Sequence, residues 1–474
     1  MLTHPAGFRQ RRALNWLLAG AMYAFFYMAR YNFAAVSALL AELFGWSNTR
    51  LGVISAVGTT VYGVSVFFNG PLADKIGGRR AILVGAAGAA GFNLLFGLMH
   101  LSLAQPAVWA GEGAARHVVL AAQIRMGMTG STVIAAFATL WACNHYFQSF
   151  GALSIVKINA AWFHVRERGF FAGIFGILIR AGLILAFYGS PLILSVLPWQ
   201  WVFWVPALML GGLFAANFVL LRNTPRDAGF GEYETGDETA AEKAEPASLG
   251  FVLAKVFASP TVWTIAGASL MIGFVRRSVI DDWWPKYFAN VFGADPKHLA
   301  AFPPYLVAAW GIALAGIVGG IVFGLLSDRV FGGRRAPVVV IAFGAQALLL
   351  AAFGLAERAG AGAMTAACAL LSISFFVNGA HGMVGGAASM DFGGRKAAAT
   401  AAGLIDGVQY LIAGPLVGVG MGRLLDTYGW SVWQLAPLPF ALAGALLMSR
   451  LWNALPAARL AAGEHASKPA AATQ

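Results

Sequence analysis

Two arginines lie deep inside apolar stretches of the chain, where a guanidinium is suited to binding an anion. Arg30 falls in the stretch 14–40 and Arg277 in the stretch 260–290. In a helix that rises 1.5 Å per residue, each lies about 25 Å from the start of its stretch, near the middle of a bilayer. A guanidinium at that depth costs about 3 kcal/mol or more, so it must face a wet cavity and meet an anion. One arginine from each stretch predicts a clamp for a phosphate or a carboxylate.

The alternative is that internal acids neutralise these arginines. On a helix, Arg277 and Asp281 are i,i+4 neighbours and could form an ion pair. Arg30 has no acid within one helical turn. Arg276 lies about 100° around the helix from Arg277 and is a secondary candidate for the anion site.

The composition predicts that lipid surrounds these stretches. Hydrophobic residues make up 59% of the chain and charged residues 11%, and the mean hydropathy is +0.70. Soluble domains carry about 25% charged residues. The net charge of +12 does not indicate a nucleic-acid partner, because the charges fall in turns between apolar stretches.

The cysteines and the N-terminal segment point to no further chemistry. Cys143 and Cys368 lie inside apolar stretches, which suits neither a disulfide framework nor a metal cluster. The apolar stretch after Arg12 is too long for a cleavable signal. No nucleophile, metal cluster or phosphate-cradling loop is evident, so we expect no enzyme activity, no cofactor and no metal.

Twelve apolar stretches of roughly 20 or more residues predict an all-α membrane protein with twelve transmembrane helices in two six-helix halves. The stretches are 14–40, 51–71, 81–104, 129–160, 168–194, 199–222, 260–290, 302–327, 336–357, 361–389, 397–424 and 431–454. The acidic segment near the midpoint of the chain is typical of a flexible linker. The predicted division is an N-terminal half at 1–222, a cytoplasmic linker at 223–249, a C-terminal half at 250–456 and a disordered tail at 457–474.

A turn motif occurs once in each half. The sequence G-P-L-A-D-K-I-G-G-R-R at 70–80 reappears as G-L-L-S-D-R-V-F-G-G-R-R at 324–335. Spanning helices that repeat in halves are typical of secondary transporters, whose halves rock about a central site. We expect these turns and other basic loops to latch the cytoplasmic side when the site opens outward. The predicted gating residues are Asp74, Arg79, Arg80, Arg166, Arg168, Asp328, Arg334, Arg335, Arg395 and Lys396.

The basic residues also predict the orientation of the helices. Alternate loops are rich in lysine and arginine, and such loops face the cytoplasm. Both termini and the linker are therefore expected to be cytoplasmic. The half-repeat is sufficient for a working monomer.

Six further segments are distinctive in sequence. They are Y-M-A-R-Y-N-F at 27–33, F-Q at 147–148 with Gly151 and Lys157, R-E-R-G at 166–169, R-S-V-I-D-D-W-W-P at 277–285, R-K-A-A-A-T-A-A-G at 395–403 and L-D-T-Y-G-W at 425–430. These segments resemble the organophosphate:phosphate antiporters of the major facilitator superfamily, and the resemblance covers most of residues 14–454. The resemblance implies the major facilitator fold and exchange of a phosphorylated organic metabolite for inorganic phosphate. It implies the inner (plasma) membrane of a bacterium, with Arg30 and Arg277 as phosphate ligands.

The chain departs from this family on the fifth helix. Glycerol-3-phosphate transporters have a histidine there that lines the site, whereas Ile179 stands at that position here, followed by Arg180. Arg180 is either a third anion ligand, which favours a more highly charged substrate such as a phosphoglycerate, or a contact to another helix. The predicted substrate-binding residues are Arg30, Arg277, Arg180, Lys157, Tyr27, Tyr31, Asp406 and His381.

Asp406 leaves three interpretations open, because a lone carboxylate at bilayer depth must be paired or protonated. It could pair with a cavity arginine, couple transport to protons, or accept a hydrogen bond from a sugar hydroxyl. If it carries a proton, the chain could instead be a proton-coupled symporter of an organic anion. A third interpretation is a sensor of phosphate esters that does not transport them.

Overall fold

The computed structural model describes residues 5–102, 109–110, 117–118, 130–164, 176–231, 233, 257–384 and 404–454. Helices make up nearly all of the regular structure in these residues. The exception is a two-residue antiparallel ladder between β1 (Trp109–Ala110) and β2 (His117–Val118). The predicted all-α membrane fold is confirmed, because a helix occupies the position of each of the twelve predicted stretches.

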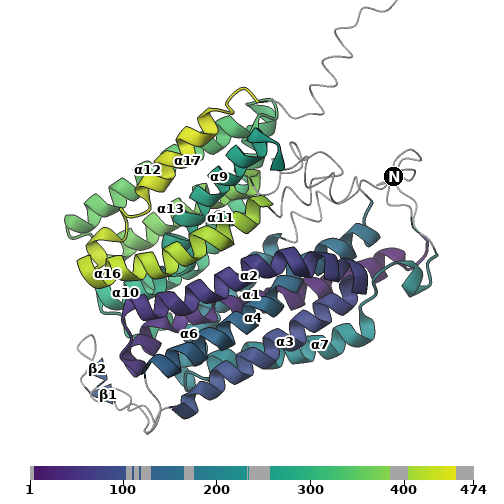
Figure 1. Ribbon diagram of the computed structural model, residues 1–474, viewed down its shortest axis with the longest axis horizontal. Coiled ribbons are helices and arrows are strands. Elements are labelled where there is room, and N and C mark those ends of the chain that lie inside the picture. Colours follow the sequence, from purple (N-terminus) through teal and green to yellow (C-terminus); the bar gives the residue numbers. More distant parts are fainter. Residues whose placement is uncertain are drawn as a thin grey trace, which may run out of the picture.

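The helices up to residue 228 form one bundle, purple to teal in Figure 1. They are α1 (Phe8–Phe44), α2 (Asn48–Ile76), α3 (Gly78–Leu98), η1 (Met99–Ser102), α4 (Gly130–Trp162), a helix from residue 176 that continues through η3 (Leu185–Gly189) and α6 (Ser190–Val196), α7 (Trp201–Leu220) and η4 (Arg226–Ala228).

The helices from residue 260 onward form the second bundle, green to yellow in Figure 1. They are α9 (Pro260–Val275), η5 (Arg276–Asp281), α10 (Trp284–Phe292), η6 (Leu299–Ala301), α11 (Pro303–Arg329), α12 (Arg335–Arg358), α13 (Ala363–His381), η8 (Gln409–Ala413), η9 (Leu416–Met421), α16 (Gly422–Tyr428), η10 (Trp430–Val432) and α17 (Leu438–Ser449).

Eight of the described helices are long and apolar enough by themselves to span a membrane. Helices α1 and α4 are long enough but more polar. The seventh predicted stretch is broken into α9, η5 and α10. The last stretch holds only α17 as a longer helix, because Pro437 and Pro439 favour a helix start at that point.

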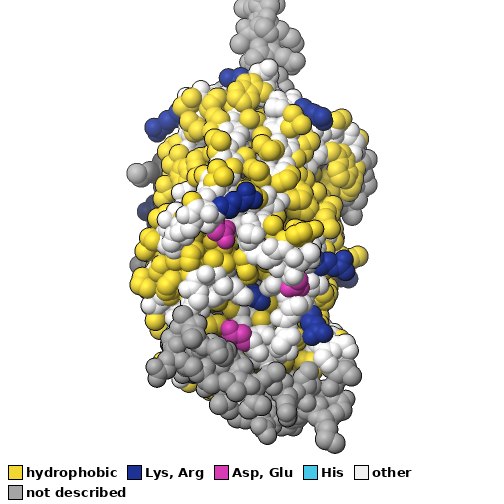
Figure 2. All heavy atoms as spheres, turned by 90° about the vertical axis from the view of Figure 1, so that its left-hand side faces the viewer, with side chains coloured by type: hydrophobic (Ala, Val, Ile, Leu, Met, Phe, Trp, Pro, Cys, Tyr) yellow, Lys and Arg dark blue, Asp and Glu magenta, His cyan; other side chains and the backbone are white. Residues whose placement is uncertain are grey.

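The two bundles meet closely along α2, which packs on η8, η9 and α16 of the second bundle. Glycine permits this approach. A Cβ atom added to Gly52 of α2 would lie 2.0 Å from the carbonyl oxygen of Gly418 in η9. Figure 2 views the end of the molecule at which α2 begins. On its described surface, charged side chains stand singly among hydrophobic ones, with no basic patch of the kind that binds nucleic acid.

Candidate functional site

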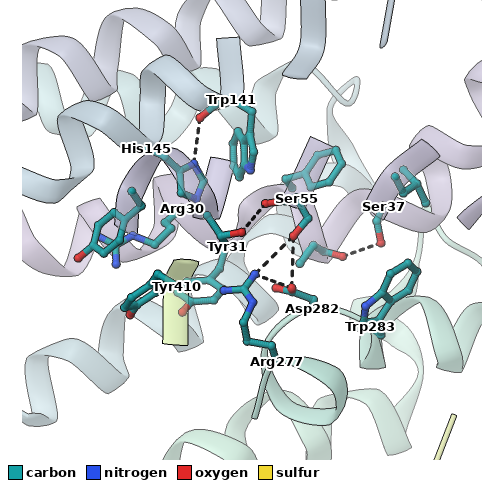
Figure 3. A pocket seen from close by; sticks show the side chains of 15 residues that line it. Arg30, Tyr31, Ser37, Ser55, Trp141, His145, Arg277, Asp282, Trp283 and Tyr410 are labelled. Atoms are coloured by element: carbon teal, nitrogen blue, oxygen red, sulfur yellow. Dashed lines mark hydrogen bonds and ion pairs between the residues drawn. The ribbon is translucent and has the colours of Figure 1, made fainter. Parts of the chain in front are cut away.

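A cavity between the two bundles brings the two predicted arginines together (Figure 3). Helices α1, α2 and α4 supply its first side, and η5, the residues after it and η8 supply the other. The lining residues are Arg30, Tyr31, Phe33, Ala34, Ser37, Leu51, Ser55, Thr59, Tyr62, Trp141, His145, Arg277, Asp282, Trp283 and Tyr410. Of the predicted substrate-binding residues, Arg30, Arg277 and Tyr31 therefore share one cavity.

Arg30 is buried and makes no ion pair with any residue that the structure describes. Its side chain is 6% exposed, and its guanidinium lies 4.4 Å from the ring centre of Tyr62 and 5.1 Å from that of Tyr27. Nη2 donates long hydrogen bonds of 3.4 Å to the backbone and side-chain oxygens of Gln148. Aromatic faces offset part of the cost of a buried cation. The guanidinium thus retains capacity to bind an anion.

A cluster of three buried asparagines holds α1 in place close to Arg30. Asn32 Nδ2 donates to Asn93 Oδ1 at 3.1 Å, and Asn93 Nδ2 donates to Asn144 Oδ1 at 3.0 Å. Asn144 Nδ2 donates to the carbonyl oxygen of Ala29 at 3.1 Å. These bonds link α1, at the residues on either side of Arg30, to α3 and α4. A buried polar network of this kind is costly to break.

Arg277 already has an acidic partner, and that partner is Asp282. Arg277 Nη2 lies 2.6 Å from Asp282 Oδ2. Ser55 of α2 accepts a bond from Arg277 at 3.4 Å and donates to Asp282 at 3.3 Å, so this pair also bridges the two bundles. The alternative that an internal acid neutralises Arg277 is thus supported, but through Asp282 and not through the i,i+4 neighbour Asp281. The Oδ2 atom of Asp281 lies 3.2 Å from Nε of Arg276.

The helix geometry explains this shift of partner by one residue. The segment η5 (Arg276–Asp281) is π-helical, and the backbone N–H of Asp282 donates to the carbonyl oxygen of Arg277 at 3.3 Å. A π-turn places residue i+5, and not i+4, above residue i. The indole of Trp433 donates to the carbonyl oxygen of Ser278 at 2.8 Å and anchors this turn.

The remaining predicted substrate-binding residues do not line the cavity. Tyr27 stacks on Tyr31 with ring centres 5.7 Å apart. Arg180 donates to Asn378 of α13 at 2.7 Å, a contact between bundles that fits the interpretation as a helix contact. Lys157 is half-buried on α4.

Asp406 and His381 belong to a polar chain within the second bundle. Arg276 Nη1 lies 3.3 Å from His381 Nε2, and Gln409 Nε2 lies 3.4 Å from both His381 Nδ1 and Asp406 Oδ1. Asp406 forms no direct ion pair within the described part of the chain. All three interpretations of this acid therefore stay open.

The predicted latch is only partly within the described residues. Arg166, Arg168, Arg395 and Lys396 lie outside them, as does the side chain of Asp74. Asp328 Oδ1 lies 2.6 Å from Arg335 Nη1 in its own turn, and Arg334 donates to the carbonyl oxygen of Phe331 at 3.2 Å. In the first copy, Arg79 donates to the carbonyl oxygen of Phe218, and Arg80 is exposed. The latch itself stays a prediction.

A contact between bundles that the sequence did not reveal lies at the opposite end of α2. Asp426 of α16 accepts four hydrogen bonds from the first two residues of α2. Oδ1 accepts from N and Nδ2 of Asn48 at 2.8 and 2.9 Å, and Oδ2 accepts from N and Oγ1 of Thr49 at 2.8 and 2.6 Å. A carboxylate at a helix N-terminus is favourable for both its charge and its bonds. This acid therefore fastens the two bundles together there.

Replacing Asp426 with alanine is expected to loosen this end of the interface. Each of these hydrogen bonds contributes about 1 kcal/mol net, and about 1.4 kcal/mol corresponds to a tenfold change in a population. We therefore expect the population that is open at this end to rise about tenfold. The measurement is labelling of Ser37→Cys by an impermeant maleimide, in a Cys143→Ala/Cys368→Ala background, from the side on which α2 begins. Asp426→Asn keeps the shape and one acceptor oxygen and should increase labelling less. Equal labelling of wild type and Asp426→Ala would contradict the expectation.

Comparison with known proteins agrees with the geometry. Residues 19–418 match the family model described as "Major Facilitator Superfamily". The chain is 27% identical to the glycerol-3-phosphate transporter of Bacillus subtilis (strain 168), covering 91% of this chain and 90% of that protein. It is 26% identical to a probable hexose phosphate transport protein of Chlamydia pneumoniae, covering 91% and 89%. The crystal structure of a D-xylose-proton symporter superposes with a TM-score of 0.69 at 14% identity, covering 95% and 98%.

Proposed function

The chain belongs to the major facilitator superfamily, and from this premise we propose that it exchanges a phosphorylated organic metabolite for inorganic phosphate by alternating access. The names of the Bacillus and Chlamydia relatives support a phosphate ester as the substrate. The observation that carries the proposal is the cavity in which Arg30 and Arg277 face each other from opposite bundles. A phosphate that bridges them would draw the bundles together.

The charges of the cavity give a physical reason for exchange. Its lining holds two guanidiniums and one carboxylate, and Arg30 is the cation without an acidic partner among the described residues. Closing an empty site would cut that cation off from solvent with no anion beside it, which costs several kcal/mol. A bound phosphate removes this cost. The loaded carrier therefore changes conformation readily, and the empty carrier does so slowly.

The proposal extends to the arrangement of the chain in the membrane. We place both termini and the linker 223–249 in the cytoplasm of a bacterium, with the halves at 1–222 and 250–456. One copy is sufficient, because both sides of the cavity come from the same chain. Alternating access then opens the contact between α2 and α16 when the cytoplasmic side closes.

Counterflow in proteoliposomes tests the proposal. Vesicles loaded with unlabelled phosphate should take up labelled phosphate rapidly, and vesicles without internal phosphate should not. Uptake should withstand an uncoupler and should be inhibited by phosphate esters. Uptake that collapses with an uncoupler and needs no internal phosphate would instead support the proton-coupled symporter, in which Asp406 is the proton site.

A further inference from the structure

His145 lines the cavity, although no sequence motif marked it as a ligand. It lies on α4 beside Arg30 in Figure 3, and its side chain is 4% exposed. The rings of Trp141 and Tyr62 flank it, with ring-centre distances of 4.8 and 6.4 Å. Packing therefore fixes the imidazole in the lining of the cavity that also holds both arginines.

One hydrogen bond determines which nitrogen of this ring carries the hydrogen. Nδ1 lies 2.9 Å from the carbonyl oxygen of Trp141. A carbonyl oxygen only accepts, so Nδ1 carries the hydrogen, and in the neutral ring Nε2 presents a lone pair. Nε2 has no hydrogen-bond partner among the residues that the structure describes. The free nitrogen is thus an acceptor in a cavity whose two guanidiniums only donate.

The charged groups around the cavity favour the neutral ring. Arg30 faces it from α1 and Arg277 from η5, and Asp282 is already bonded to Arg277. The other titratable groups in the lining are tyrosine hydroxyls, from Tyr31, Tyr62 and Tyr410. A protonated imidazole would be a third cation beside two others, which Coulomb repulsion opposes.

We propose that His145 is a third ligand of the phosphate group and accepts a hydrogen bond from its P–OH, so that the site selects the monoprotonated form of a phosphate monoester. The inference rests on the proposed function, because it assumes that phosphate occupies the cavity. The two guanidiniums would hold the unprotonated oxygens, and Nε2 would hold the protonated one. A phosphate group has a second pKa of about 6 as a monoester, so both protonation forms exist near neutral pH. Sulfate carries no such hydrogen near neutral pH and would place an oxygen lone pair against the lone pair of Nε2.

The test is the pH dependence with which a phosphate monoester, glycerol phosphate, inhibits phosphate counterflow, with equal pH on both sides of the membrane. Inorganic phosphate keeps one P–OH above its second pKa, whereas a monoester loses its only one. For the wild type, the Ki for total ester should therefore rise roughly tenfold for each pH unit above the second pKa of the ester. Sulfate should not compete. His145→Gln offers both a donor and an acceptor, so its Ki for the ester should change less than about threefold between pH 6 and 8, and sulfate should compete.

His100→Gln is the matched control. His100 makes a similar bond, with Nδ1 3.0 Å from the carbonyl oxygen of Gly97, but it does not line the cavity. The pH profile of its Ki for the ester should match that of the wild type. A flat wild-type profile, or a His145→Gln profile like that of the wild type, would overturn the role of His145 and leave phosphate exchange standing. A folded wild type that exchanges no phosphate would overturn the proposed function and this inference together.

Discussion

Replacing Arg30 with alanine is expected to reduce phosphate counterflow at least about 100-fold. A bidentate contact to phosphate consists of two charge-assisted hydrogen bonds, each worth roughly 1.5–3 kcal/mol, so their loss exceeds the 2.7 kcal/mol that corresponds to 100-fold. No described carboxylate is bonded to Arg30, so its removal leaves no acid behind without a partner. The measurement is the initial rate of labelled phosphate entry into phosphate-loaded vesicles.

Two further variants separate binding from folding. Arg30→Lys keeps the charge but loses the planar fork, so it should retain weak exchange with a raised KM. Arg450→Ala removes an exposed arginine beyond α17 and should exchange like the wild type. If Arg30→Ala exchanged phosphate at a normal rate while folded, Arg30 could not be a ligand.

Replacing Asp282 with asparagine is expected to tighten phosphate binding and slow exchange. In the structure, Asp282 neutralises Arg277 across 2.6 Å, so an incoming phosphate must share or displace this carboxylate. Removing the competing charge should lower the Kd for phosphate about tenfold, or 1.4 kcal/mol. Release would then leave two guanidiniums uncompensated, which should reduce the maximal exchange rate. Calorimetric titration gives the Kd, and counterflow gives the rate.

Asp281→Asn is a matched control for this prediction. The substitution is the same and lies one residue earlier, but Asp281 pairs with Arg276 and does not line the cavity. Its Kd for phosphate should stay within about twofold of the wild-type value. The change expected for Asp282→Asn is about tenfold, or 1.4 kcal/mol. Weaker binding by Asp282→Asn would show that Asp282 orients Arg277 and does not compete with the substrate.

The apolar stretches and their two arginines could be predicted because length, apolarity and charge are local properties of a sequence. All twelve stretches contain a helix in the structure. A fixed rise per residue predicted similar depths for Arg30 and Arg277, and in the structure both line one cavity. The turn motif that occurs twice predicted two related halves, because a repeat is visible in the sequence without knowledge of any contact.

The partner of Arg277 shows where local reasoning fails. A regular helix repeats every 3.6 residues and predicts a pair with Asp281, whereas the π-turn moves the pairing to Asp282. The indole of Trp433, far along the chain, stabilises that turn. An irregular turn held by a distant side chain cannot be found from the spacing of charges.

The sequence alone therefore determined the membrane class, the helical stretches and the two arginines that share the cavity. The tertiary structure alone decided that His145 faces the cavity, that Arg180 contacts Asn378, and that Asp426 joins α16 to the start of α2. The physical reason is the rotation of each helix about its axis. A difference of one residue turns a side chain by about 100°, and only packing between the two bundles fixes that angle.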